Sequence, residues 1–450
     1  MRMDGLFQRT RPALVAACAL ATVLFTPTVT LADEEQYMAV PSSRVGPYSA
    51  MGTGYYGGII DYMNYVNRTG GVNGVKLIWQ ECETEYNAAR TVECYQRLLN
   101  YGDHKMVVFD TLGTPGAYAV INRMKDDEVV LAQYGYGRTD AADGTVWPWV
   151  FNAASHYWSQ IAVKMNFMAQ QEGGVENMRG KKIVHLHIDS AYGREPLPAM
   201  RQIAEDWGVT LVEISIPPPG LEQQSQWLQI RKEQPDWVTF WGAGSGMNST
   251  AMTNAARVGF PRDRMMYVTF GGAEEDMIPA GDAAIGTYAV ANAVPGTDFP
   301  LIADIKKVVY DEAGDGNMQN PDRVGTVYYN RGVGAAVMWI EALKNAQELS
   351  GKIGQEINGE EFRAGYEALK MSPEKLQEIG IDGMVAPFDL SCSKHDGAGM
   401  FKVMQWNGEK FEMVTEDWVE PPDPTFIRDL VESSAAKFAD ENGITPVDCS

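Results

Sequence analysis

The sequence lacks an uncharged apolar run long enough to cross a bilayer, which takes about 20 residues. The apolar run Ala13–Phe25 falls short of that length. Positive charge is also scarce, because 37 lysines and arginines stand against 59 acidic residues and the formal net charge is −22. Such a surface repels phosphate backbones and anionic lipids, so we expect no nucleic-acid partner. Because no apolar run is long enough, we also expect that the protein does not span a membrane.

The N-terminal segment has the composition of a secretory signal peptide. Arginines near its start supply positive charge, the short apolar run follows, and the small residues Thr30-Leu31-Ala32 end it. We therefore predict a cleaved signal peptide over 1–32, a mature chain that begins at Asp33, and export to the periplasm. An ordinary frayed N-terminus and a lipoprotein attached at Cys18 are the alternatives. Because Cys18 lies inside the apolar run, a soluble product is favoured.

Cysteine is rare, with five residues in the whole sequence. Removing the predicted signal peptide removes Cys18 and leaves Cys82, Cys94, Cys392 and Cys449. An even number of cysteines in an exported chain favours disulfides, and three pairings are open. We predict Cys82–Cys94, which would tie a strand end to the next helix, and Cys392–Cys449, which would hold the C-terminal tail. Free buried thiols are the alternative.

Histidine is equally rare, and no catalytic or metal-binding set can be assembled from it. His185 and His187 alternate along a predicted strand and share a face, but no third ligand lies nearby in the sequence. Ser245 lies among glycines, but Ala243 takes a glycine position of the G-x-S-x-G nucleophile motif. We therefore expect no metal, no cofactor and no catalytic residue. A secreted α/β enzyme is the rival interpretation.

Strand-like and helix-like segments alternate through the first part of the chain. Short apolar strands separated by helices of ten or more residues indicate β-α-β units and parallel sheets. Two successive sets predict an α/β fold with two lobes. The first set has strands at 36–40, 75–80, 106–109, 129–132 and 150–152, with helices at 50–68, 87–100 and 115–125. The second has strands at 182–188, 210–214 and 237–240, with helices at 157–171, 194–207, 221–233 and 247–258.

After about Tyr288 the pattern becomes more helical. We predict helices at 301–312, 326–349 and 360–369. The segments 401–406 and 411–414 then alternate like the two strands of a hairpin around Asn407-Gly408.

The segment Val45–Leu77 contains Gly52, Gly54 and Gly57 in a G-x-G-x-x-G pattern. In a dinucleotide site the first glycine directly follows a strand, so that the helix N-terminus meets the pyrophosphate. Here about eleven residues separate the strand end at Val40 from Gly52, and two tyrosines fill variable positions. We therefore interpret these glycines as part of the first strand–helix unit and predict no nucleotide cofactor.

Four loops rich in glycine, hydroxyl and aromatic residues each follow a predicted strand. Ligands of doubly wound folds lie at the carboxyl ends of the strands, so we expect these loops to line one cleft. In the first loop, Thr114 is the expected N-cap and Pro115 the first helical residue. Free N–H groups at such a helix end suit a carboxylate, and plain capping is the alternative. The four strand-end loops are Leu112–Gly116, Tyr134–Gly137, Ser190–Gly193 and Gly242–Gly246.

Several further motifs occur in order between about residues 36 and 406. They are Gly46-Pro47, the turn Gly70–Gly74, Asp189-x-x-Tyr192-Gly193, Ala255–Gly259 and Gly281-Asp282-Ala283-Ala284-x-Gly286. Together with the alternating elements, they resemble type I periplasmic solute-binding proteins of ABC importers, in the leucine/isoleucine/valine-binding branch. The resemblance implies two Rossmann-like lobes with parallel-dominated sheets and a ligand cleft between them. It implies three hinge crossovers near 151–156, 288–297 and 384–390, with lobe 1 formed by 33–153 plus 292–386 and lobe 2 by 154–291 plus 387–450.

The resemblance also implies which residues contact the ligand. Thr114 matches the hydroxyl residue that holds the ligand carboxylate, and Tyr192 matches the tyrosine that closes from the second lobe. The other positions implied are Leu112, Gly113, Tyr134, Gly135, Tyr136, Gly244, Ser245, Thr269 and Phe270.

One position departs from the amino-acid binders of this family. They place an acid ahead of the G-D-A-A motif to bind the ligand ammonium, and that position here falls on Thr269 or Phe270. Glu274 or Glu275 would replace it if the loop shifts. If neither does, the ligand lacks an α-amino group, and the aromatic loops would suit a hydrophobic or aromatic carboxylate.

The sequence therefore predicts a monomeric periplasmic protein that captures a small solute by hinge closure and delivers it to an ABC permease in the inner membrane. An amino acid, with branched-chain ones first, is the predicted ligand. The alternatives are an aromatic or short organic acid or an amide, and a sensor-linked receptor instead of a transport protein.

Overall fold

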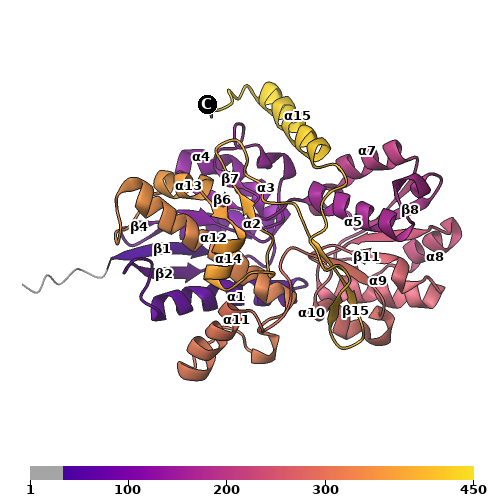
Figure 1. The fold of residues 1–450 in the computed structure, drawn as a ribbon, viewed down its shortest axis with the longest axis horizontal. Helices are drawn as coiled ribbons and strands as arrows, with labels where there is room; N and C mark the ends of the chain where they lie inside the picture. Colours follow the sequence, from indigo (N-terminus) through magenta and orange to yellow (C-terminus); the bar gives the residue numbers. More distant parts are fainter. Residues whose placement is uncertain (1–33, 450) are drawn as a thin grey trace, which may run out of the picture. The chain divides into compact units, whose positions relative to one another are not determined.

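The computed structural model describes residues 34–449 (Figure 1). The predicted signal peptide over 1–32 and Cys18 lie outside these residues. The rest of the chain is the mixed α/β structure with parallel-dominated sheets that the sequence predicts.

Within the described residues, seven strands form one sheet in the order β16-β15-β12-β11-β10-β8-β9. The five strands from β12 to β9 run parallel, β15 pairs antiparallel with β12, and β16 pairs antiparallel with β15. Every residue of the central strand β10 is buried, as expected of a parallel strand covered on both faces. The strands are β8 (Lys182–Ile188), β9 (Thr210–Ile216), β10 (Trp237–Trp241), β11 (Met265–Tyr267), β12 (Tyr288–Ala291), β15 (Lys402–Trp406) and β16 (Phe411–Met413).

The N-terminal strands pair separately from that sheet. Strand β1 pairs in parallel with β2, and β5, β6 and β7 form a second parallel group. Short antiparallel pairs join β3 to β4 and β13 to β14. These strands are β1 (Glu35–Val40), β2 (Lys76–Glu81), β3 (Asn100–Tyr101), β4 (His104–Lys105), β5 (Val108–Phe109), β6 (Val130–Ala132), β7 (Val150–Phe151), β13 (Lys370–Met371) and β14 (Phe388–Asp389).

The helices follow the predicted pattern with a few differences. The helix expected at 194–207 is broken at Pro196, because proline cannot donate a hydrogen bond inside a helix. Strand β11 and helices α14 and α15 were not predicted. The helices are α1 (Ser49–Arg68), α2 (Ala88–Leu98), α3 (Thr114–Val120), α4 (Met124–Asp127), α5 (Tyr157–Gln171), α6 (Ala191–Arg194), α7 (Leu197–Trp207), α8 (Gln224–Glu233), α9 (Ser245–Val258), α10 (Glu274–Met277), α11 (Pro300–Ile305), α12 (Val327–Ser350), α13 (Gly359–Glu367), α14 (Pro373–Ile379) and α15 (Pro424–Asn442).

Helices α1 and α12 pack closely through glycine (Figure 1). A Cβ atom at Gly58 would lie 2.3 Å from the carbonyl oxygen of Tyr329, and one at Gly332 would lie 1.9 Å from the carbonyl oxygen of Tyr55. Any side chain at either position would therefore push the two backbones apart. The glycines of the G-x-G-x-x-G pattern lie inside α1, away from a strand end. Their place supports the interpretation as helix packing and not as a nucleotide loop.

Both predicted disulfides are present. Cys82 is bonded to Cys94, and Cys392 is bonded to Cys449. The first joins the residue after β2 to helix α2, and the second ties the C-terminal segment to the residues after β14. Among the described helices, none has the length and apolar composition to cross a membrane.

Asp276 in α10 joins three helices. Its carboxylate accepts hydrogen bonds from Asn248 Nδ2 in α9 (2.9 Å), Tyr328 Oη in α12 (2.6 Å) and the Ala273 backbone N–H (3.1 Å). Burial raises the pKa of Asp276 to about 7, although these donors act in the opposite direction.

We expect the Cys392–Cys449 disulfide to stabilise the fold more than Cys82–Cys94. The sequence separations are 57 and 12 residues, and loop-closure entropy gives about 4 and about 3 kcal/mol. Urea unfolding of Cys392→Ser/Cys449→Ser and of Cys82→Ser/Cys94→Ser would measure this order. Labelling of all four thiols by a thiol reagent in unfolded, unreduced wild-type protein would contradict both bonds.

Replacing Asp276 should flatten the pH dependence of stability near neutrality. Its folded-state pKa lies above the ordinary aspartate value of about 3.9, so the folded state holds a proton that the unfolded state has lost. The resulting stabilisation is full below about pH 4 and is lost as pH rises through about 7. Between about pH 6 and 8, the free energy of unfolding of Asp276→Asn should therefore fall less than that of wild type. The exposed Asp298→Asn is the control, and equal slopes in all three proteins would contradict the prediction.

Candidate ligand-binding site

The first strand-end loop differs in one detail from its prediction. Helix α3 begins at Thr114 with Gly113 as the N-cap, so the prediction of Thr114 as N-cap was wrong by one residue. The Thr114 hydroxyl does not cap the helix and lies instead 2.9 Å from the Tyr157 hydroxyl at the start of α5. Both residues are buried. Thr114 thus links the loop after β5 to the helix that leads into the seven-stranded sheet.

Asp110 at the end of β5 orders the loops that follow β5 and β6. Its carboxylate accepts hydrogen bonds from Tyr55 Oη (2.6 Å), Tyr136 Oη (2.6 Å) and the Leu112 N–H (3.1 Å). Leu112, in the loop that follows, has a positive φ of 51°. Burial raises the pKa of Asp110 to about 6. The two phenol rings are therefore held in fixed orientations.

Arg331 of α12 is the buried cation of this region and was not found from the sequence. Its Nη2 donates to the carbonyl oxygens of Tyr134 (2.8 Å) and Gly135 (3.1 Å). Its guanidinium carbon lies 3.5 Å from the ring centroid of Phe270. Over the described residues, no carboxylate lies within salt-bridge distance of Arg331, and its Nε and Nη1 have no hydrogen-bond partner. A guanidinium stays charged in a protein, so this side chain is a buried positive centre without a salt bridge, and its charge acts to lower the pKa of Asp110.

Gln160 of α5 connects the loop after β6 to the loop after β11. Its Nε2 donates to the Gly135 carbonyl (2.8 Å), and its Oε1 accepts from the Thr269 hydroxyl (3.1 Å). The Phe270 ring meets the edges of Tyr136 and Tyr192 at centroid distances of 6.3 and 6.2 Å. Thr269 and Phe270 therefore lie beside the positions predicted from the other strand-end loops.

Tyr192 lies in the same region. Its hydroxyl donates to the Gly242 carbonyl (2.9 Å), and its ring lies 5.4 Å from that of Tyr157. Gly244, with φ of 85°, is the N-cap of α9, which begins at Ser245. A Cβ atom at Gly244 would lie 2.7 Å from the Pro47 carbonyl oxygen, so this loop meets the residues before α1.

These contacts bring most of the predicted residues together. We call these residues, together with the neighbours that they contact, the tyrosine–arginine cluster. Asp110, Tyr157, Gln160 and Arg331 were missed by sequence reasoning, although a lone arginine in an otherwise apolar stretch of α12 is a usable signal. The cluster comprises Tyr55, Asp110, Leu112, Gly113, Thr114, Tyr134, Gly135, Tyr136, Tyr157, Gln160, Tyr192, Thr269, Phe270 and Arg331.

Glu274 and Glu275 are bonded elsewhere. Glu274 accepts from the Val327 N–H (3.0 Å), and Glu275 accepts from the Thr326 hydroxyl (3.1 Å). Arg323 lies 3.3 Å from Glu275. Both acids therefore hold the N-terminus of α12, and over residues 34–449 neither forms a hydrogen bond to the tyrosine–arginine cluster.

The histidine pair forms no metal site. His185 and His187 stack along β8 with ring centroids 5.1 Å apart, and burial lowers the pKa of both. Over residues 34–449, no group of three histidine, cysteine or acidic side chains is arranged to hold a metal ion.

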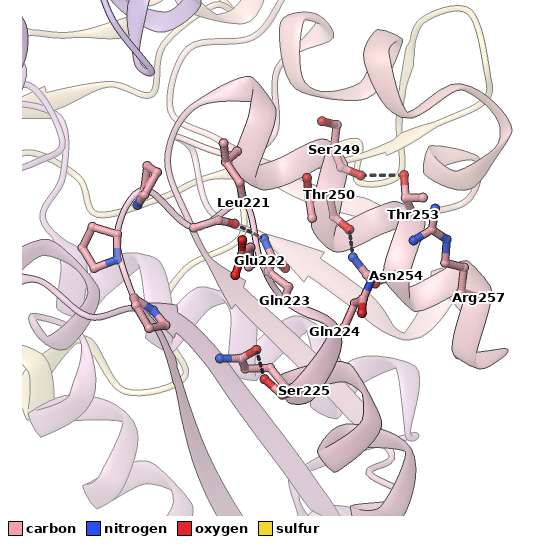
Figure 2. Close-up of a pocket in the computed structure, with 15 residues that line it drawn as sticks. Leu221, Glu222, Gln223, Gln224, Ser225, Ser249, Thr250, Thr253, Asn254 and Arg257 are labelled. Carbon is pink, nitrogen blue, oxygen red and sulfur yellow. Dashed lines mark hydrogen bonds between the residues drawn. The ribbon is translucent and has the colours of Figure 1, made fainter.

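A large groove lies away from the cluster (Figure 2). It measures about 1120 Å³ and is lined by the Pro217–Glu222 loop, the start of α8 and one face of α9. Two of its polar side chains bond within α9, Thr253 to the Ser249 carbonyl and Asn254 to the Thr250 carbonyl. None of the residues predicted to bind ligand lines this groove. The buried donors of the cluster are the stronger indication of a binding site.

Comparisons with known proteins agree with this geometry. A family model described as periplasmic binding protein matches residues 35–410. An ABC transporter permease from the Pseudomonas fluorescens group has a solved structure 38% identical to this chain, with a TM-score of 0.86 over 93% of this chain and 100% of that one. No curated protein matches the sequence significantly.

Two more distant structures share the fold alone. A branched-chain amino acid ABC transporter from Thermus thermophilus with bound valine is 19% identical, with a TM-score of 0.74 over 88% of this chain and 99% of that one. An ABC transporter solute-binding protein from R. palustris in complex with benzoate is also 19% identical, with a TM-score of 0.63 over 86% and 96%. The family match and the 38% identical structure decide the classification. This chain belongs to the periplasmic binding proteins, the substrate-binding components of ABC transporters, as the sequence predicts.

Proposed function

We propose that this chain captures a small organic solute in the tyrosine–arginine cluster and delivers it to an ABC permease in the inner membrane. The observation that carries the proposal is the origin of the cluster's residues. Thr114 and Gly135 come from loops after the N-terminal strands, whereas Tyr192 and Phe270 come from loops of the seven-stranded sheet. A solute held there contacts both groups of strands at once, which is the requirement for capture by closure.

Most of the strands support a division into two lobes, whereas β14 follows the proposed boundary at 386 and pairs with β13 on the other side of it. The seven-stranded sheet draws its strands from 182–291 and 402–413, and β1, β2, β5, β6 and β7 all lie within 35–151. We therefore propose lobe 1 as 33–153 plus 292–386 and lobe 2 as 154–291 plus 387–450, with hinge crossovers near 151–156, 288–297 and 384–390. Export to the periplasm through the 1–32 signal peptide belongs to the same proposal.

Contacts of Glu195 support closure between these lobes. The Glu195 carboxylate, at the corner between α6 and α7, accepts from Tyr118 Oη in α3 (2.8 Å) and from the Thr139 N–H (2.7 Å). Its carbonyl accepts from Trp158 Nε1 (2.8 Å). Opening the lobes would break the first two bonds.

Two chemical classes of solute are candidates. An amino acid is the first, since a structure with the same fold holds valine. A carboxylate without an α-amino group is the second, and another structure with this fold holds benzoate. The second is favoured by the positions of Glu274 and Glu275, which are bonded to the N-terminus of α12.

A thermal-shift screen against amino acids, aromatic acids, short organic acids and amides would test solute capture. A bound solute raises the melting temperature by mass action. Failure of every compound class to raise it would contradict the proposal.

Thr114→Ala and Tyr192→Ala should each weaken binding of the solute found in that screen by at least tenfold, or about 1.4 kcal/mol. Thr114→Ala removes the hydroxyl beside Tyr157, and Tyr192→Ala removes a ring that packs against Phe270. Isothermal titration calorimetry would measure the affinity. Tyr95→Phe is the control, because that hydroxyl bonds to Asp127 outside the cluster. Unchanged affinity in both alanine variants would reject the assigned site.

A further inference from the structure

The unused N–H groups of the Arg331 guanidinium could bind an anion, and no anion is assigned to them. Arg331 is fully buried, and only its Nη2 is used, in bonds to two backbone carbonyls. Its Nε and Nη1 have no partner over residues 34–449. A carboxylate accepts strongly from unused guanidinium N–H groups, which makes these donors a recognition group for an anion.

Two further unpartnered polar groups lie beside this arginine. A Cβ atom at Gly135 would lie 2.7 Å from Asn292 Nδ2, 2.9 Å from Arg331 Nη2 and 3.1 Å from Ser155 Oγ. Asn292 and Ser155 are 3% and 0% exposed, and neither Asn292 Nδ2 nor Ser155 Oγ has a hydrogen-bond partner among the described residues. Buried donors without partners are costly, so these two beside Gly135, next to an arginine whose Nε and Nη1 are also unused, indicate a site built for an acceptor.

The buried acids of the region already accept hydrogen bonds from protein donors. Both oxygens of Asp110 accept hydrogen bonds from tyrosine hydroxyls, and both oxygens of Asp276 accept from Asn248, Tyr328 and the Ala273 N–H. The cluster therefore offers unpaired donors and a positive charge but no free carboxylate for an ammonium group.

The walls beside these donors are aromatic. The Phe270 ring lies against the guanidinium, and the rings of Tyr192 and Tyr136 pack around Phe270. A ring or branched alkyl group would match these surfaces.

We infer that Arg331, Ser155 and Asn292 bind the anionic group of the solute, and that the solute is a small carboxylate with an apolar or aromatic body and no ammonium group. This inference rests on the proposed capture of a solute and deepens it by naming the solute class. Ser155 lies between β7 and α5, and Asn292 directly follows β12. The carboxylate would thus contact two of the proposed hinge crossovers as well as α12.

Matched probes separate the contribution of the solute's carboxylate charge from that of an ammonium charge. The carboxylates are 3-phenylpropanoate, 4-methylpentanoate and benzoate, and each has a neutral amide of the same shape. Phenylalanine and leucine correspond to 3-phenylpropanoate and 4-methylpentanoate with an ammonium group added. We expect at least one carboxylate to bind the mature protein at least tenfold more tightly than its amide and than its amino acid, as measured by calorimetry.

Variants then test the assigned residues with the carboxylate that binds best. Arg331→Met should weaken binding by at least about 30-fold, and Ser155→Ala and Asn292→Ala by at least about fivefold. Arg331→Lys should recover only part of the loss, because an ammonium lacks the planar array of N–H donors. Arg363→Met is the control, since that arginine pairs with Glu367 and lies over Trp149.

The melting temperature without ligand distinguishes a ligand-binding role of Arg331 from a purely structural role. Without ligand, Arg331→Met should melt at or above the wild-type temperature, because it removes a buried charge with unpartnered N–H groups. A fall in melting temperature with unchanged carboxylate affinity would overturn the assignment of Arg331. Amides that bind as tightly as carboxylates, or no carboxylate binding at all, would also overturn the inference. Tighter binding of leucine or phenylalanine would overturn the solute class while leaving solute capture intact.

Discussion

The close packing of α1 against α12 determines where the chemistry of this protein lies. Gly58 and Gly332 bring the two backbones together, and side chains on the neighbouring turns are directed by that contact. Tyr55 of α1 reaches Asp110, and Arg331 of α12 reaches the carbonyls of the loop after β6. A wider separation would carry the hydroxyl and the guanidinium away from both partners. The buried cation therefore depends on two residues that have no side chain at all.

Tyrosine hydroxyls and buried acids together set the polarity of the cluster. Asp110 and Asp276 are each surrounded by donors, and burial still raises the pKa of both carboxyls. Arg331 has the opposite arrangement, with most of its donors unused. The acids are therefore structural groups that orient rings and helix ends, whereas the arginine keeps capacity for a further contact.

Much of the fold could be predicted because its signals are local. The helix Tyr157–Gln171 and the strand Lys182–Ile188 were predicted with the bounds that the structure shows, from their periodicity and flanking turns. Strand β11 was missed because three residues carry too little pattern. Helix α15 was missed because alanines supply part of its buried stripe, which weakens the contrast between its faces.

The site was less predictable than the fold. Thr114, Tyr136 and Tyr192 lie in loops whose glycines mark them in the sequence, and the structure brings these residues close together. Arg331 lies inside a long helix, and the carbonyls that it contacts are 196 and 197 positions away. No local pattern encodes such a contact, and the lack of a salt bridge to Arg331 among the described residues becomes visible only when its neighbours are known.

The bond between Cys392 and Cys449 changes what a break in the chain would do. The loop that it closes contains β15, β16 and α15, and the tail also donates from the Val447 N–H to the Thr145 carbonyl (2.7 Å). A single proteolytic cut between these cysteines would leave both pieces covalently joined. The antiparallel edge of the seven-stranded sheet would then stay attached to a nicked protein, where an unlinked fragment would diffuse away.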